Sequence, residues 1–516
     1  MTKRKVGLYI VLLAIIIGAA PYFTGYLVET KFQDVVKVTS EFEPLKVEVT
    51  EYQRGWRKSY AKTRVTLQGQ YLEKLMLAIE KNNPSKSSEL KNQEMSIILE
   101  HEIRHGPFVQ LQDNNYRDWR FALATIQSKL FLTEKAKEVL TSEFGSSELL
   151  NIDTQMSIEG DVQIKMQGKA LKLKEPDGKE HVIWKGIQAN WVLSRDMKRF
   201  QGDTFLPGFD FDWEGKHYFG ENIIFKTERV KSPEGLWLGK GTMTMQKMEV
   251  NQTPEQSLSI EGLSMGGVVG AENSMIDSSG SVNIEQIKYA NRLWGPINLA
   301  FSTKNIDVHV AKSFGELSHQ MQMATSAEEI TYIQKMAALL PDLLKTRPEF
   351  NIENMTVHTD QGDIKGLLNL AIGGAAAYDL NNPQQIFQSI ALKANVLFPK
   401  TLLREILISQ YSKKAEAINE AAKSSNLKTS SNEEITATVG KSADEAISKQ
   451  IQQGTLVEKD RNYLIEVELF QGHLKVNGKS MDLPQAGLSQ SGPPQSGTPQ
   501  SGNPNLPAEQ PSSTPK

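Results

Sequence analysis

Apolar and polar side chains alternate at every second residue in many short stretches of this chain, and this pattern constrains the fold most. The stretches at residues 45–49 and 152–158 show it clearly. A period of two places one set of side chains on one face of a β-sheet. Turn signals such as Asp177-Gly178 and Asn477-Gly478 separate the stretches. Many short strands joined by turns predict antiparallel hairpins rather than parallel strands with helical crossovers.

Three segments show apolar residues at helical spacing instead. The first is short and covers residues 133–144. The second, residues 326–347, begins with Ser326 and Glu329, which have the spacing of a capping box. The third, residues 399–453, begins with a proline, a residue suited to the first turn of a helix. All three are amphipathic, which predicts accessory helices with one apolar stripe facing the core.

The N-terminus carries an uncharged apolar run, residues 6–28, directly after Lys3, Arg4 and Lys5. About 20 apolar residues in a helix span a hydrocarbon core of about 30 Å, so the run predicts a transmembrane helix. The alternative is a cleaved signal peptide with its cleavage site near residues 18–20. A basic flank stays in the cytoplasm, so we expect a single-pass protein of the bacterial inner membrane with its body in the periplasm.

These features divide the chain into four parts. A cytoplasmic stub (residues 1–5) and the transmembrane anchor (6–28) precede a periplasmic body (29–483). Residues 484–516 repeat a unit of Gln, Ser, Gly and Pro, which predicts a disordered tail because it lacks apolar side chains to bury. The fold class we expect is α+β and β-dominated. It is an elongated antiparallel meandering sheet with accessory amphipathic helices, preceded by one transmembrane helix.

Composition excludes several classes of protein. The 516 residues include no cysteine, which excludes disulfides, thiolate catalysis and cysteine-bound zinc. A hydrophobic content of 39% fits neither a polytopic membrane protein nor a wholly disordered chain. The formal net charge of -3 gives no basic surface of the kind that binds nucleic acid.

One motif resembles a metalloprotease site. His101-Glu102-Ile103-Arg104-His105 has the two histidines and the glutamate that bind and use zinc when they share a helix face. The residues around it alternate with a period of two, which predicts a strand. Four residues of strand span about 13 Å, too far for both imidazoles to bind one zinc ion with bonds of about 2 Å.

A second motif, Gly262-Leu263-Ser264-Met265-Gly266, matches the nucleophile elbow of serine hydrolases. That elbow needs a strand, a strained turn at the serine and then a helix. The glycines that follow Ser264 favour a hairpin instead. The carboxylates Asp210 and Asp212 cannot be told from an ordinary strand surface. We therefore predict no catalytic residues, no metal site and no cofactor.

Five short segments resemble the YdgA family of Gram-negative bacteria. They are Tyr52-Gln53-Arg54-Gly55-Trp56, His105-Gly106-Pro107-Phe108, Leu206-Pro207-Gly208, the hairpin from Phe350 to Leu370, and Gly472 through Val476-Asn477-Gly478. The chain departs from the family at Arg57, where the family usually has an aromatic residue. The resemblance implies an inner-membrane protein with a periplasmic body and a domain of unknown function, and it implies no catalytic residues.

The function we expect is that of a non-catalytic binding module in envelope lipid handling, because many half-apolar strands can hold acyl chains. The alternative is an envelope scaffold or assembly factor that acts through protein partners. A zinc hydrolase at His101 and His105, or a serine hydrolase at Ser264, is a third hypothesis. The expected partners are the inner membrane and a lipid or an envelope protein, without nucleic acid. Whether the chain forms a homo-oligomer stays open.

Overall fold

A computed structural model gives the fold of the chain. It describes residues 3–41, 45–67, 96–106, 109–113, 116–132, 137–138, 141, 147–174, 181–213, 215–251, 257–289, 292–323, 328–373, 388–424 and 432–481. The helix predicted at residues 133–144 lies largely outside these residues. The predicted disordered tail, residues 484–516, lies entirely outside them.

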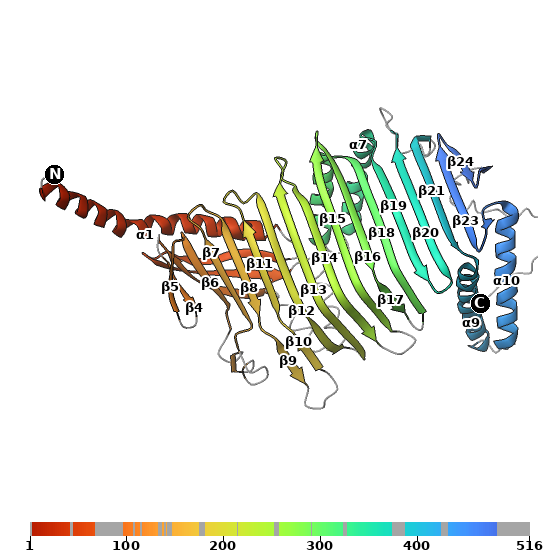
Figure 1. Ribbon diagram of the computed structural model, residues 1–516, viewed down its shortest axis with the longest axis horizontal. Coiled ribbons are helices and arrows are strands. Elements are labelled where there is room, and N and C mark those ends of the chain that lie inside the picture. The colour runs from red at the N-terminus through yellow and green to blue at the C-terminus, as the bar shows by residue number, and fades with distance from the viewer. Residues whose placement is uncertain are drawn as a thin grey trace, which may run out of the picture.

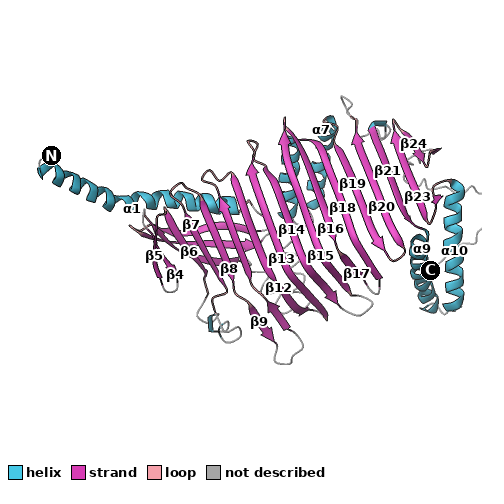
Figure 2. Ribbon diagram, in the orientation of Figure 1, coloured by secondary structure: helices cyan, strands magenta, loops and turns pink. Residues whose placement is uncertain are grey.

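In the part of the chain that the structure describes, one antiparallel sheet of 23 strands runs the length of an elongated molecule (Figures 1 and 2). The β-dominated, antiparallel sheet predicted from the alternation is therefore confirmed. Its first strands are β1 (Leu45–Gln53), β2 (Lys58–Leu67), β3 (Ser96–His105), β6 (Ala124–Leu130), β7 (Leu150–Met156), β8 (Val162–Gly168), β9 (Leu171–Lys174), β10 (His181–Trp184) and β11 (Ile187–Leu193). A separate two-stranded sheet contains β4 (Val109–Asp113) and β5 (Tyr116–Arg120).

The central strands β12, β13, β14, β15 and β18 are the longest, with 15 or 16 residues each. The remaining strands are β12 (Arg199–Trp213), β13 (Lys216–Lys231), β14 (Trp237–Asn251), β15 (Leu258–Glu272), β16 (Met275–Ile284), β17 (Gln286–Tyr289), β18 (Arg292–Asp307), β19 (Glu349–Thr359), β20 (Gly362–Ile372), β21 (Ile390–Pro399), β22 (Val457–Lys459), β23 (Asn462–Phe470), β24 (His473–Val476) and β25 (Lys479–Met481).

The helices lie at both ends of the sheet and behind its middle (Figure 2). They are α1 (Lys3–Thr39), α5 (Val308–Met323), α6 (Glu329–Ala337), α7 (Leu340–Lys345), α9 (Lys400–Ser424) and α10 (Asn432–Gln453). Residues 326–347 and 399–453 were expected to be helical, and α6, α7, α9 and α10 lie within them. The sequence patterns did not predict α5.

The N-terminal apolar run belongs to a long helix that packs on the sheet. α1 projects beyond the sheet at its N-terminal end, and its C-terminal part lies along the first strands (Figure 1). Val28 and Phe32 are buried there in a core cluster. Within the described residues, no helix combines the length and the apolar character that crossing a membrane requires. The prediction of a transmembrane helix at residues 6–28 is therefore wrong, and the last part of this run, at Val28, packs into the core beside the sheet.

Two buried clusters hold the ends of the sheet. The first joins α1 to the first strands and includes Ile103, Met156 and Val162. The second joins α9 and α10 to the last strands around Ile447 and Tyr463. Between these ends α5, α6 and α7 lie behind part of the sheet, where α5 contacts β16 and β18 (Figure 2).

Candidate functional site

The strand register aligns one line of side chains across almost the whole sheet. Each residue of this line lies directly opposite the next on the neighbouring strand, and opposed residues share a face. We call this line the apolar row. Its members are Tyr52, Ala61, His101, Ser128, Ile152, Met166, Ala189, Thr204, Phe225, Met243, Met265, Val282, Leu299, Met355, Gly366, Val396 and Ile465. The row contains no lysine, arginine, aspartate or glutamate.

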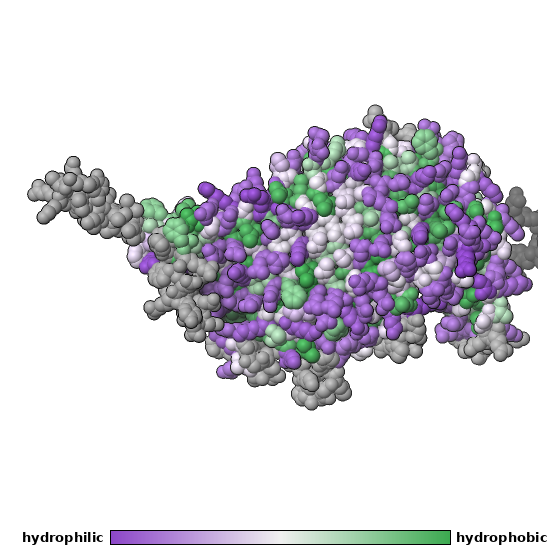
Figure 3. Space-filling model, viewed as in Figure 1, coloured by the Kyte–Doolittle hydropathy of each residue, from purple (hydrophilic) through white to green (hydrophobic). Residues whose placement is uncertain are grey.

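The neighbouring line, one residue along each strand, faces the opposite side of the sheet and is polar. We call it the polar row. Its members are Gln53, Tyr60, Glu102, Gln127, Asp153, Lys165, Asn190, Asp203, Lys226, Thr242, Gly266, Ser281, Ala300 and Asn354. Hydrophilic side chains are interspersed with apolar ones over the sheet in the view of Figure 3. The two rows therefore differ in polarity, although the side of the polar row also exposes Val192, Val230 and Val268.

A second line beside the apolar row makes that face wider. It runs through Gly280, Phe301, Ile352, Leu368, Ala394, Val467 and Val476. Register shifts in β19, between Ile352 and Met355, keep both lines on one side of the sheet. A bulge re-aims side chains in this way, because one inserted residue offsets the alternation. Methyl, methylene and thioether groups therefore lie side by side over several strands.

The two ends of the apolar row are covered, whereas its middle retains solvent exposure. Phe32 of α1 lies against the His101 ring at the first end, with 5.1 Å between ring centroids. Ile465 at the other end packs against the second buried cluster. In between, Phe225 is 42% exposed and Met265 is 41% exposed. Ile223 and Met245 on the same face are buried, so the candidate binding surface is the part of the row around Phe225 and Met265, which we call the uncovered middle.

The dimensions of the uncovered part suit an extended apolar ligand. The strands β13, β14, β15, β16, β18, β19, β20 and β21 follow one another there. At ~4.8 Å between strands, the distance from the first to the last is about 34 Å. One acyl layer of a bilayer is about 15 Å thick, half of the hydrocarbon core. The surface is therefore long enough for an extended acyl chain.

The two histidines of the metalloprotease-like motif lie on strand β3, as the alternation predicted. Both are buried under α1. His101 is hydrogen-bonded through Nε2 to Thr63 Oγ1 at 2.8 Å and through Nδ1 to Ser128 Oγ at 2.7 Å. Within the described residues, no group of three His, Cys, Asp or Glu side chains could hold a metal ion.

His105 connects the sheet to α1. Its Nδ1 donates to the carbonyl oxygen of Pro21 at 3.0 Å, which leaves Nε2 of the neutral ring to accept from Ser59 Oγ at 3.0 Å. Burial lowers the pKa of His105, and burial lowers the pKa of His101 to about 4. Both rings are therefore neutral at pH 7 and serve as hydrogen-bonding groups under the helix.

Ser264 lies in the middle of β15, on the face opposite Met265. The strand continues to Glu272, so the turn and helix that a nucleophile elbow requires do not follow the serine. Asp212 is paired with His217, whose Nδ1 is 2.9 Å from Asp212 Oδ1. These candidate residues lie far apart along the sheet and form no shared site.

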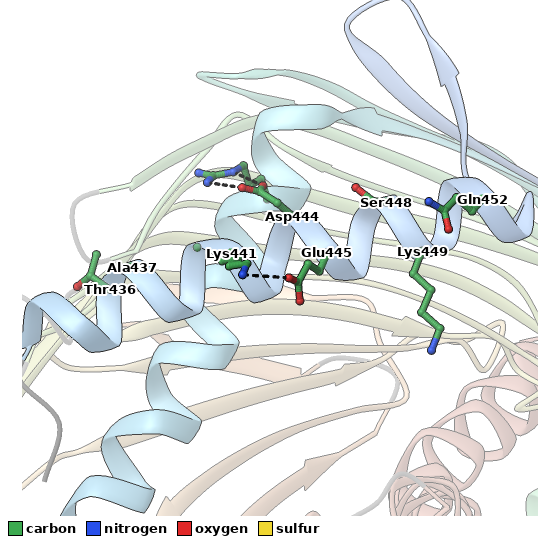
Figure 4. Close-up of a pocket in the computed structure, with 10 residues that line it drawn as sticks. Thr436, Ala437, Lys441, Asp444, Glu445, Ser448, Lys449 and Gln452 are labelled. Carbon is green, nitrogen blue, oxygen red and sulfur yellow. Dashed lines mark hydrogen bonds and ion pairs between the residues drawn. The ribbon is translucent and has the colours of Figure 1, made fainter.

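Two of the hollows on the surface of the described residues are lined largely by charged and polar side chains. One of about 680 Å³ lies along α10, where Arg404 pairs with Asp444 and Lys441 pairs with Glu445 (Figure 4). Another, of about 510 Å³, lies among charged side chains of β2 and β3, including Lys62 and Glu100. These ion pairs already satisfy the charges, so we identify no anion site there.

Sequence reasoning missed the apolar row, because alternation gives the faces of each strand but not the register between strands. Met243 and Met265 are 22 positions apart, and only the hairpin between β14 and β15 brings them together. The available signal was the spacing Met243, Met245 in one strand and Leu263, Met265 in the next. Combining it with the turn would have suggested the pairing.

Comparison with known proteins identifies the family. A family model described as "Bacterial protein of unknown function (DUF945)" matches residues 1–484. The chain therefore belongs to this bacterial family. The finding agrees with the expected family of unknown function and does not confirm the narrower YdgA name. Among curated proteins, none matches the chain.

Proposed function

We propose that this member of the DUF945 family is a non-catalytic binding module that holds the acyl chains of envelope lipids on the uncovered middle of its apolar row. The narrower YdgA assignment belongs to this proposal and rests on the motifs at residues 52–56 and 206–208. The proposal also places the body, residues 29–483, in the periplasm, where cell fractionation would find it.

The observation that carries the proposal is the continuous register of apolar side chains, uncovered in its middle and backed by the polar row. Apolar surface removed from water contributes about 25 cal/mol per Å². An extended alkyl chain across β13 to β21 would remove Phe225 and Met265 from water together. Contiguous exposed apolar surface marks ligand or partner sites in many proteins.

Fluorescence titration of the full chain with dansyl-labelled undecanoic acid tests this function. Met265→Glu places a charge on the apolar face, and Ser264→Glu places the same charge on the opposite face of the same strand. We expect saturable binding that Met265→Glu weakens about tenfold or more, since an unpaired charge near an apolar chain is costly. Ser264→Glu should bind as the unmodified chain does.

Two results would reject the lipid proposal. One is the absence of saturable binding to the full chain. The other is an equal loss of affinity in both variants while circular dichroism shows that both are folded. The two substitutions introduce the same group one residue apart, on opposite faces of the strand. A difference in affinity between the two variants therefore shows which face of the sheet binds the probe.

The alternative function, a scaffold that binds envelope proteins, is favoured by α6. No residue of this helix is buried, and Ile330 and Ile333 are 65% and 51% exposed at a spacing of three. A photo-crosslinking residue at position 330 should capture one reproducible partner in cells if this function operates. The same residue at position 335, occupied by an exposed lysine, should not capture it.

A further inference from the structure

Four methionines lie on the apolar face near its middle. Met243 and Met265 lie directly opposite each other on β14 and β15, and Met355 belongs to the same row on β19. Met245 points to the same side two residues from Met243. Unbranched thioethers adapt to irregular apolar partners, so they suit a surface that accepts chains of different shapes.

The four side chains differ in their access to solvent. Met265 is 41% exposed, whereas Met245 is 5% exposed. Met156, in the cluster under α1, is 1% exposed. Oxidation of a thioether by peroxide requires access to the sulfur, and it converts an apolar side chain into a polar one. Met265 is therefore more accessible to an oxidant than Met245 and Met156.

We propose that Met265 is an oxidative modification site, at which hydrogen peroxide forms methionine sulfoxide and thereby weakens acyl-chain binding. A sulfur lone pair attacks one peroxide oxygen, the O–O bond breaks, and proton transfer releases water. The sulfur loses two electrons and the peroxide gains them. The inference rests on the proposed function, because the loss of affinity presupposes a ligand on this face.

The physical effect follows from the place of Met265 in the row. Its neighbours across the strands are Met243 and Val282, neither of which offers a side-chain hydrogen-bond donor to a sulfoxide oxygen. An alkyl chain laid over this position would cover a polar group without a partner. We expect the affinity for dansyl-labelled undecanoic acid to fall about tenfold.

The test combines peptide mass spectrometry with the binding titration. Mild treatment of the full chain with hydrogen peroxide should oxidise Met265 before Met245 and Met156, and bound dansyl-labelled undecanoic acid should slow oxidation at Met265. The treated protein should bind the probe about tenfold more weakly. Met265→Leu keeps an apolar side chain of similar volume without the sulfur, so its binding should resist peroxide.

Each negative result contradicts a different claim. If Met245 or Met156 is oxidised as fast as Met265, the assignment of the site is wrong. If the oxidised chain and the unoxidised chain bind the probe equally well, or if peroxide weakens Met265→Leu as much, the inference is overturned while the proposed function stands. If the untreated chain shows no saturable binding, the proposed function fails, and with it the effect on affinity proposed here.

Discussion

Acidification should destabilise this protein through His101. The ring is 7% exposed under α1, and both of its nitrogens are hydrogen-bonded to hydroxyls. In the neutral ring one nitrogen donates and the other accepts. Protonation would make both nitrogens donors and would bury a positive charge beside Phe32. Burial accordingly lowers the pKa of His101 to about 4, from an ordinary value of 6.5.

The size of the effect follows from the difference between the folded and unfolded pKa values. The unfolded chain binds a proton near pH 6.5, whereas the folded chain resists it until about pH 4. The contribution of neutral His101 to the unfolding free energy is therefore fully present above pH 6.5. It is lost progressively as the pH falls toward 4. A depression of this size corresponds to about 3 kcal/mol of unfolding free energy. Lowering of the pKa of His105, also by burial, acts in the same direction.

Urea unfolding of the full chain at several pH values between 7 and 4 measures this loss. His101→Gln cannot titrate, so the variant should be less stable at pH 7 and should show a shallower dependence on pH. Each protein gives a curve of unfolding free energy against pH. Subtracting the curve of the variant from that of the unmodified chain cancels the contribution of carboxylates that titrate in the same range. Equal slopes for the two proteins, or an NMR titration of His101 with a pKa near 6.5, would refute the reasoning.

Two further predictions concern the same core. Gly25→Ala should lower the unfolding free energy by about 1–3 kcal/mol despite its better helix propensity, because the new Cβ would lie 2.8 Å from His105 Cε1 in a ring fixed by two hydrogen bonds. Ile103→Ala should cost about 2–5 kcal/mol in denaturant unfolding, because Ile103 is 0% exposed. Ile97→Ala on the same strand, at a position 48% exposed, is the matched control and should cost less.

The sequence allowed the strands to be predicted better than the partners of the helices. A period of two identified the strand that carries His101 and His105 and so argued against a zinc helix. The same reasoning failed at residues 6–28, because an apolar helix that packs on a sheet and one that spans a bilayer look alike in sequence. Only the burial of Val28 and Phe32 against the sheet distinguishes them.

The register of the sheet could not be predicted, although it decides the candidate site. A slip of one residue between two strands would move a whole set of side chains to the other face. The bulge in β19 offsets the register by one residue in this way, and the sequence around Glu353 does not predict it. Without that bulge, Ile352 and Met355, which are three residues apart, would face opposite sides.

The polarity of the side chains in the apolar row changes along its length, and the element that covers the row changes at the same places. At the first end the row includes His101 and Ser128, which form hydrogen bonds with each other under α1. A buried polar group without a partner is costly, so these hydrogen bonds are what allow the helix to cover this end permanently. In the middle, Met265, Val282 and Leu299 need no hydrogen-bond partner. Exposing these side chains to water costs only hydrophobic free energy, and a ligand that binds transiently would recover it. A transient ligand therefore suits the middle of the row, whereas a permanently packed helix suits its end.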